Sequence, residues 1–497
     1  MRLLILFHRW VGVVLCLMFA AWFATGAMMV FVAFPALPGG DRATHSERIA
    51  PGQVTLTPRE AAARLGDPSD LRLVGRAGQA AYLGTRQGHA IAVAATDGRV
   101  LAPLDATQAA QVASAFAHAH AASVSEPFDY DQWIVHQQFD PLRPFYRVRL
   151  ASDDGLDLYV SARTGEVVQR TRRLERAANW VGSVIHWVYY VPLRRSFAAW
   201  DWTVWIGALV GLASVSAGLT LGVRATLKMQ RSRRSSPSPF RGLMRWHHLL
   251  GLVAGLFVFA WIGSGWLSMD HARLFSSGEA SRAAAAAYVG DDGPAATRLG
   301  LADVQTAARG ATRVEFGRVA GCDVAASVGP GLQRSLAACP QGRQDGATLS
   351  PALITAALRS AWPQARIGPL SALRADSPYP KAEGLPDGVL RAKVDGAEPF
   401  SVFVHPASGK LLVVMDRSRA AYAWLYYMVH TYNYPGLSDR PALRITILLV
   451  PLALGFAFAV TGVLAGLRRL GSFTPHRQEG LADAAGEGLV GSPGRRV

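Results

Sequence analysis

The chain has 497 residues, of which half are hydrophobic and only 17% are charged, and its mean hydropathy is +0.17. Four apolar stretches are each long enough to cross a bilayer, which takes about 20 residues of helix. They cover residues 11–34, 204–223, 249–267 and 445–467. A soluble two-domain protein has no need of four such stretches. This composition therefore excludes that class and indicates an integral membrane protein.

The first apolar stretch carries a face with a histidine. His8, Gly12, Trp22 and Gly26 recur 239 positions later as His247, Gly251, Trp261 and Gly265. The apolar run is longer than the 7–15 residues of a signal-peptide core, and its face recurs deep inside the chain. We therefore expect residues 1–35 to form a retained transmembrane helix and residues 245–270 to form a second helix of the same kind.

Two long polar segments, residues 36–178 and 271–419, follow the first and third spans. Strand patterns occur at 145–150 and 155–160 in the first segment and at 389–394 and 400–404 in the second, each pair followed by a glycine turn. Helical patterns precede them at 57–65, 106–119 and 351–361. Each segment is predicted to be a small external α+β domain. Cys322 and Cys339 lie in the second, where an oxidising compartment would permit a disulfide, whereas Cys16 lies in the first span and is expected to pack there.

A second histidine motif precedes the second and fourth spans. Trp180, His186, Tyr190, Gly211, Gly218 and Gly222 recur 244 positions later as Trp424, His430, Tyr434, Gly455, Gly462 and Gly466. We expect an interfacial helix plus a transmembrane helix at 179–224 and again at 420–470. The predicted fold is a membrane all-α core of four transmembrane helices in two parallel repeats, with two external α+β domains. Histidines are uncommon inside membranes, so two recurring pairs suggest a site built between the halves.

The distribution of charge predicts the topology. The loop at 225–244 is rich in arginine and has no acidic residue, and such short basic loops stay on the cytoplasmic side. Both termini are then cytoplasmic, and the two long segments are external. The net charge of +16 thus has a topological explanation, which excludes nucleic acid as the partner. Residues 471–497 are expected to be a flexible cytoplasmic tail.

Taken together, these features resemble the PepSY-associated transmembrane (PepSY_TM) family over about residues 1–470. The resemblance lies in the order of spans and domains and in His8-Arg9-Trp10-Val11-Gly12, the turns ending at Glu166 and Lys410, and His430. The residues after His186 depart from the family pattern, because they lack the expected glycine. The family includes ferric-siderophore reductases of the bacterial inner membrane, which look like haem-binding electron carriers. The resemblance therefore implies PepSY-like external domains and an inner-membrane location.

The first histidine pair suits a haem. His8 and His247 each lie six residues beyond an equivalent arginine, about 9 Å deeper in the membrane, and parallel repeats would place them face to face. Two axial imidazoles leave no open position on the iron, which favours electron transfer. Gly12 and Gly251, one turn away, would make room for the macrocycle. Arg9 would either extend to the lipid surface or neutralise a haem propionate.

The second pair, His186 and His430, would bind another haem on the external side, roughly 20 Å from the first across a hydrocarbon core of about 30 Å. We therefore predict two b-type haems with bis-histidine ligation. Ordinary hydrogen-bonded packing is the alternative for any single histidine. His248 and His271, which flank the third span, compete with the chosen ligands.

The expected function is that of a di-haem transmembrane oxidoreductase, a haem-dependent ferric-siderophore reductase in iron uptake. Its partners would be a ferric-siderophore or other ferric complex, the lipid membrane, and a quinol or redox-protein donor. A nicotinamide donor is disfavoured, because Gly329-Pro-Gly331 lacks the third glycine and the strand–helix setting of a dinucleotide site. Two alternatives remain: a membrane-anchored PepSY regulatory or binding protein, and a siderophore or haem uptake permease. The few charged residues in the spans disfavour the permease.

Overall fold

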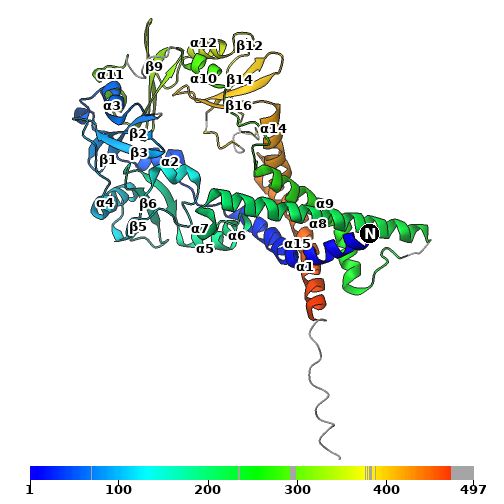
Figure 1. Ribbon diagram of the computed structural model, residues 1–497. Coiled ribbons are helices and arrows are strands. Elements are labelled where there is room, and N and C mark those ends of the chain that lie inside the picture. Colours follow the sequence, from blue (N-terminus) through cyan, green and yellow to red (C-terminus); the bar gives the residue numbers. More distant parts are fainter. Residues whose placement is uncertain are drawn as a thin grey trace, which may run out of the picture. The chain divides into compact units, whose positions relative to one another are not determined.

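The computed structural model describes residues 1–471 apart from 69, 233–235, 291–297, 375–376, 378, 380–382 and 387 (Figure 1). The tail that the sequence predicts to be flexible lies outside the described residues beyond Gly471.

Within the described residues, four helices are long and apolar enough to cross a membrane. They are α1 (Arg2–Phe31), α8 (Phe197–Arg231), α9 (Gly242–Ser268) and α15 (Pro441–Gly471), which confirms the four predicted spans. Apolar side chains on them face outward, as with Leu3 (81% exposed) and Val14 (74% exposed). Such a surface is stable in contact with lipid, and a helix satisfies its internal backbone groups without water. The protein is therefore a membrane protein.

Internal contacts divide the chain into two compact units. Unit 1 comprises Met1–Ala20, Ala213–Val258 and the described residues from Ala453 onward, and unit 2 comprises Ala21–Leu212 and Phe259–Leu452. Unit 1 is helical and holds one end of each span. Unit 2 holds the rest of the spans and the two long segments, one between α1 and α8 and one between α9 and α15. We call residues 32–196 the first inter-span segment and residues 269–440 the second.

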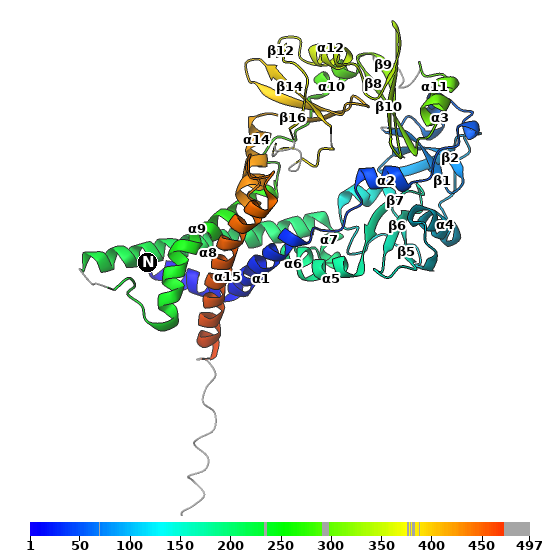
Figure 2. The same cartoon turned by 180° about the vertical axis from the view of Figure 1, so that it is seen from behind.

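The two inter-span segments share one seven-stranded antiparallel sheet (Figure 2). Its order is β11 (Gly342–Gly346), β10 (Leu332–Cys339), β9 (Cys322–Gly329), β8 (Arg313–Val319), β1 (Leu71–Arg76), β2 (Gln79–Arg86) and β3 (His89–Ala94). The segments meet where β1 pairs with β8, with Leu71 opposite Phe316. Helices α3 (Pro58–Leu65) and α11 (Leu301–Ala308) contribute to the core beside this sheet. The expectation of one α+β domain per segment did not include this shared sheet.

Each segment also has a smaller antiparallel sheet of its own. The first contains β4 (Ala121–Val124), β5 (Phe145–Leu150), β6 (Asp157–Ser161) and β7 (Val167–Thr171), with α4 (Ala106–Ala117). The second contains β12 (Arg366–Ile367), β14 (Leu390–Asp395), β15 (Phe400–Val404) and β16 (Leu411–Met415), with β13 (Ser371–Ala372) beside β14 and with α10 (Arg282–Val289) and α12 (Pro351–Ala361). The predicted strands and helices are confirmed within three residues at each end. The predicted turns contain Gly165 and Gly409 at φ 72° and 66°, a conformation that favours glycine.

Shorter helices connect these parts. They are α2 (Gly39–His45), η1 (Pro51–Gln53), η2 (Gln137–Leu142), α5 (Arg173–Val181), α6 (Ser183–His186), α7 (Val191–Arg194), α14 (Arg417–Ala423) and η3 (Trp424–His430). Helix η3 is a π-helix. Such helices are rare and occur frequently at functional sites.

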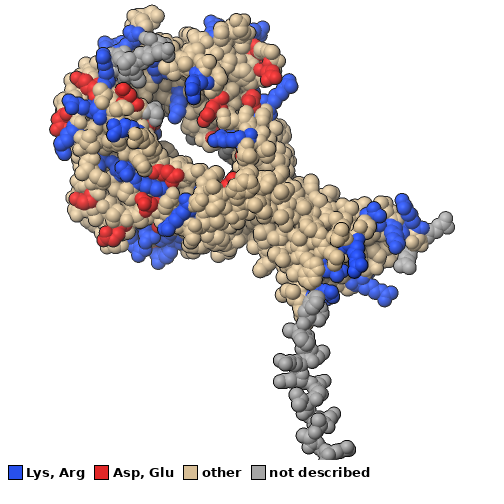
Figure 3. Space-filling model, viewed as in Figure 1, with Lys and Arg blue, Asp and Glu red and all other residues tan. Residues whose placement is uncertain are grey.

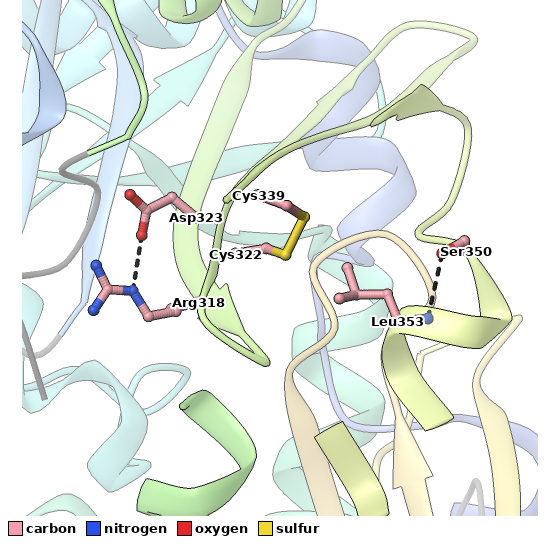
Figure 4. The surroundings of a disulfide bond; sticks show 6 residues. All are labelled: Arg318, Cys322, Asp323, Cys339, Ser350 and Leu353. Carbon is pink, nitrogen blue, oxygen red and sulfur yellow. Dashed lines mark hydrogen bonds and ion pairs between the residues drawn. A yellow bond between two sulfur atoms is a disulfide. The ribbon is translucent and has the colours of Figure 1, made fainter. Parts of the chain in front are cut away.

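A disulfide joins Cys322 to Cys339 across neighbouring strands β9 and β10 (Figure 4). Close by, Arg318 and Asp323 form a buried ion pair with a 2.8 Å separation. The sequence left this disulfide as a possibility, and the structure shows it. Cys16 is free and partly buried in α1.

Basic side chains gather at one end of unit 1. Figure 3 shows Lys and Arg there and no acidic side chain beside them on the face drawn. Around the loop between α8 and α9, the exposed basic residues include Arg224, Lys228, Arg231, Arg241 and Arg245. Two further arginines of the predicted basic loop, Arg233 and Arg234, lie outside the described residues.

Candidate functional site: two histidine pairs

The structure brings His8 and His247 together in unit 1. Their ring centroids are 6.4 Å apart and the ring planes are inclined by 39°. His8 lies near the start of α1 and His247 near the start of α9. Two rings from helices far apart in the sequence thus lie close to each other.

Hydrogen bonds fix the protonation of this first pair. The Nδ1 of His8 lies 3.0 Å from the Ser214 carbonyl oxygen, which can only accept, so Nδ1 carries the proton. The Nδ1 of His247 lies 2.9 Å from the Thr461 hydroxyl, and that hydroxyl donates its single proton to the Phe458 carbonyl. Thr461 must therefore accept from Nδ1–H. In the neutral form of each ring this bond leaves the lone pair on Nε2, the atom through which such an imidazole binds a metal.

The second pair, His186 and His430, lies in unit 2. Its ring centroids are also 6.4 Å apart, with planes inclined by 67°. His186 is the last residue of α6 and His430 the last residue of η3. Burial lowers the pKa of each of these two histidines to about 4, with the nearby His430 contributing at His186. Both rings are therefore neutral at physiological pH, as a metal ligand must be.

The second pair has the same hydrogen-bond arrangement. Thr25 lies 3.0 Å from the Nδ1 of His186, and Ser264 lies 3.1 Å from the Nδ1 of His430. Each hydroxyl donates its own proton to a carbonyl one helical turn earlier, that of Trp22 or Trp261. Each must therefore accept from the imidazole N–H. All four histidines thus have a hydrogen-bond partner at Nδ1, and in a neutral ring that donates from Nδ1 the lone pair is on Nε2.

Each histidine ring also packs against a glycine of a neighbouring helix. A Cβ built on these glycines would lie 2.6–3.7 Å from the ring carbon Cε1, for Gly218 against His8, Gly265 against His430, Gly26 against His186 and Gly462 against His247. Real Cβ atoms essentially never approach as closely as the 2.6 Å found at Gly218. These four glycines belong to the two recurring sets in the sequence. They let the helices approach closely enough for the rings to meet.

Residues 5–469 match the sequence profile of the PepSY-associated TM region. The chain belongs to this family. The match includes all four histidines, both inter-span segments and all or most of each span. No curated protein matches the chain.

His248 and His271, the two histidines that compete as ligands in this PepSY-associated chain, have other partners. Both ring nitrogens of His248 are engaged, Nδ1 with the Ser238 hydroxyl at 3.0 Å and Nε2 with the Gly222 carbonyl at 3.1 Å. The Nδ1 of His271 lies 2.5 Å from a carboxylate oxygen of Asp201, and its ring contacts two tryptophans. These contacts favour His247 over His248 as the partner of His8.

Three further residues were predicted to belong to the first site. Arg9 is exposed. A Cβ on Gly12 would meet no atom within 4 Å, whereas a Cβ on Gly251 would lie 2.9 Å from the Phe458 ring. Phe458 in turn stacks on His247 at 4.9 Å. Gly251 therefore makes room for an aromatic ring that supports His247.

The backbone turns in the same way after both histidines of the second pair. Val188 and Tyr432, each two residues beyond its histidine, have φ of 54° and 57°. This left-handed conformation is rare for residues other than glycine, especially for a β-branched valine. The segment after His186 therefore makes the turn without the glycine that the PepSY-associated family pattern led us to expect. The helices that precede the two histidines differ. Before His186, α5 and α6 are separated at Gly182, whereas before His430, α14 continues directly into η3.

The hydroxyl partners could have been recognised in part from the sequence. Thr25 and Ser264 are equivalent under the 239-residue offset, one turn after the recurring tryptophans. Thr461 has no such signal, because the residue equivalent to it under the 244-residue offset is Ala217. His8 accordingly bonds to the Ser214 backbone instead of a hydroxyl.

Proposed function

We propose that this member of the PepSY-associated family is a di-haem oxidoreductase of a bacterial inner membrane that passes electrons to a ferric complex. The observation that carries the proposal is that four histidines form two pairs with the same ring separation and the same kind of hydrogen bond at Nδ1. They stand as two pairs at the same separation, each ring held through Nδ1–H with Nε2 available. A metal-ligating histidine usually donates its other ring N–H to a protein acceptor or water, and all four histidines have an oxygen in position to accept from Nδ1.

The residues present fit a haem with two axial histidines. A nitrogen ligand lies about 2 Å from its metal, so two imidazoles that would hold one iron between them need ring centres a few ångströms apart. Both pairs stand at 6.4 Å. No group of three or more His, Cys, Asp or Glu suited to a bare metal ion occurs among the described residues. Two protein ligands per site suit an iron whose other ligands come from a porphyrin.

A haem held by His8 with His247, and another held by His186 with His430, would supply an iron centre that exchanges single electrons. The chain's own contribution is to prepare the ligands. The Nδ1–H bonds to Ser214, Thr461, Thr25 and Ser264 orient the rings and raise the basicity of Nε2. The glycines beside the rings allow the close helix contact that holds each pair.

Two observations support an orientation with both termini in the cytoplasm. The exposed basic residues around the α8–α9 loop suit the cytoplasmic face. The Cys322–Cys339 disulfide of the second inter-span segment suits an oxidising compartment such as the periplasm. On that side we propose a ferric siderophore or other ferric complex as substrate. One-electron reduction to Fe(II) would weaken its binding to hard oxygen ligands and release the iron.

The two alternative functions, a regulatory or binding protein and an uptake permease, would not require the four histidines to bind haem. A regulatory or binding protein has no need of four histidines with free Nε2 lone pairs, and a permease has no need of a reductant. For the electron donor we propose a membrane quinol or a redox protein, because the sequence contains no dinucleotide motif.

The test is iron reduction by the purified full-length protein. The protein is reduced with dithionite, freed of excess reductant and mixed anaerobically with a ferric hydroxamate complex in the presence of an Fe(II)-specific chelator. The expected result is Fe(II) formation with reoxidation of the protein, and none with the His430→Ala variant. Reduced protein that stays reduced in the presence of ferric complexes, or transport of the complex into proteoliposomes without reductant, would refute the proposal.

A further inference from the structure

A cavity of about 620 Å³ lies in unit 2, apart from both histidine pairs. Its lining comes from α2, α4, the β1–β2 turn and the turn before β7 in the first inter-span segment, and from Thr312, Arg313, Val328 and Pro330 in the second. The volume lies within the range of small-molecule sites, about 300–1,000 Å³. The cavity therefore sits where the two segments meet at the β1–β8 pair.

Arg42 lines this cavity, has a buried Nε and forms no ion pair with a carboxylate among the described residues. Its Nη2 donates to the Val168 carbonyl at 3.2 Å, and its Nε is buried and has no hydrogen-bond acceptor. No carboxylate of the described chain lies within ion-pair distance of it. Burial lowers the pKa of Arg42, and the positive charges of Arg313 and Arg72 lower it further, against the opposing effect of Glu166. Arginine nevertheless stays charged, so the cavity contains a desolvated positive charge.

The neighbouring charges are already paired. Glu166 accepts from Arg72 at 2.9 Å, and Arg313 lies 3.2 Å from Glu315. The remaining carboxylate of the lining, Glu47, accepts from the Gly78 amide at 2.9 Å, and its burial raises its pKa. Glu166 still favours the charge on Arg42, but its hydrogen-bonded ion pair is with Arg72, so Arg42 has no ion pair of its own among the described residues.

Two histidines add further hydrogen-bonding capacity to the cavity wall. The rings of His45 and His118 are 6.4 Å apart, and the Nδ1 of His45 donates to the Asp41 carbonyl at 2.8 Å. Both side chains line the cavity together with Arg42. The exposed Arg48 lines it as well. The wall therefore has an excess of cationic and donor groups.

We propose that this cavity binds a small anion bearing carboxylate or phosphate groups, with Arg42 as its principal contact. A buried charge is costly unless an opposite charge and hydrogen bonds compensate it, and a guanidinium matches the geometry of a planar carboxylate or a phosphate. The inference does not rest on the proposed redox function, because no residue of the cavity belongs to a histidine pair.

A bound anion would also contact both inter-span segments, because both contribute to the lining of the cavity. Val74 of β1 and Arg313 of β8 are register partners, and both line the cavity. The Thr312 hydroxyl, just before β8, lies 3.0 Å from the Ala43 carbonyl of α2 and 3.1 Å from the Val328 carbonyl of β9, and can donate to either. An occupied cavity would therefore strengthen the β1–β8 pairing.

The test is calorimetric titration of the full-length protein in detergent with citrate and, separately, with inorganic phosphate. We expect at least one of them to bind the wild type, a loss of at least tenfold in affinity for Arg42→Gln, and substantial retention for Arg42→Lys. Arg99→Gln is the matched control, because Arg99 is exposed and lies outside the cavity. Its affinity should equal that of the wild type.

Hydrogen exchange gives a second measurement that does not depend on a variant. The bound anion should slow exchange of the amides in 71–74 and 313–316 in the wild type. The proposal fails if neither anion binds the wild type at millimolar concentration, or if a folded Arg42→Gln protein binds as well as the wild type. It also fails if binding leaves exchange in these two strands unchanged.

Discussion

His247 and His248 are consecutive residues of α9, yet their ring nitrogens have different partners. His247 is held through Nδ1 by Thr461, and within the described chain its Nε2 has no hydrogen-bond partner. His248 is bonded at both nitrogens, to Ser238 on one side and to Gly222 on the other. One helix thus has one histidine with an Nε2 that bonds to no described residue and one histidine that is bonded at both nitrogens.

This difference predicts opposite effects of two neighbouring substitutions. His247→Ala should reduce the haem content from two to one per chain, because one axial ligand of the first pair is lost. His248→Ala should keep both haems and lower stability alone, since it breaks only hydrogen bonds. The measurement is haem per purified chain by the pyridine haemochrome method. Equal haem content in the two variants would contradict the assignment of His247.

The hydroxyl of Thr461 should influence the haem without touching it. Thr461→Val removes the acceptor for His247 Nδ1–H, and loss of such a partner typically costs about 10–100-fold in metal affinity. We expect faster haem loss to an apo-globin acceptor and a shifted reduction potential for one of the two haems. Thr446→Val on the same helix is the matched control, because the Thr446 hydroxyl is exposed and bonds only to its own helix. If both variants behave alike, Thr461 does not position the ligand.

The glycine beside His8 should tolerate no side chain. A Cβ at Gly218 would lie 2.6 Å from His8 Cε1, so Gly218→Ala should displace the ring and lower haem occupancy of the first pair. Gly207→Ala in the same helix has open space around it and should leave occupancy unchanged. Low-spin electron paramagnetic resonance signals distinguish the two sites. A wild-type spectrum for Gly218→Ala would mean that His8 does not act as a ligand.

Much of this arrangement follows from the sequence. The spans and the strands beside Gly165 and Gly409 were predictable, because hydrophobic periodicity reports local structure directly. The recurrence of His8 at His247 indicated two rings that lie 6.4 Å apart in the structure. The β1–β8 pairing was not predictable, since it depends on which sheet edges meet in three dimensions. The hydrogen bond from His8 to the Ser214 carbonyl was not predictable either, because any residue at position 214 has a backbone carbonyl.

The ion pair between Arg72 and Glu166 predicts how stability depends on pH. Burial opposes ionisation of Glu166, but the charges of Arg72, Arg313 and Arg42 outweigh it and lower its pKa from 4.5 to about 2. Because the pKa of Glu166 is lower in the folded protein than in the unfolded chain, the ionised carboxylate stabilises the fold at pH values above 4.5. This contribution to stability is lost as the pH falls from 4.5 through about 2. A shift of this size corresponds to about 3 kcal/mol at neutral pH.

Thermal unfolding of the full-length protein in detergent measures this contribution. Glu166→Gln should lower the unfolding temperature at neutral pH and flatten its acid dependence in that window. Asp97→Asn removes an exposed ion pair with Arg99, which contributes little, and should change neither. A Glu166→Gln protein with the wild-type acid dependence would show that the pair does not stabilise the fold.

The most direct test of the central claim is the visible spectrum of the purified wild-type protein, expressed with ample haem and recorded before and after dithionite. Two haems with paired histidine ligands predict a low-spin b-type spectrum with sharp reduced bands and a stoichiometry of two per chain. A colourless protein, or one whose reduced spectrum lacks the b-type bands, would contradict the account.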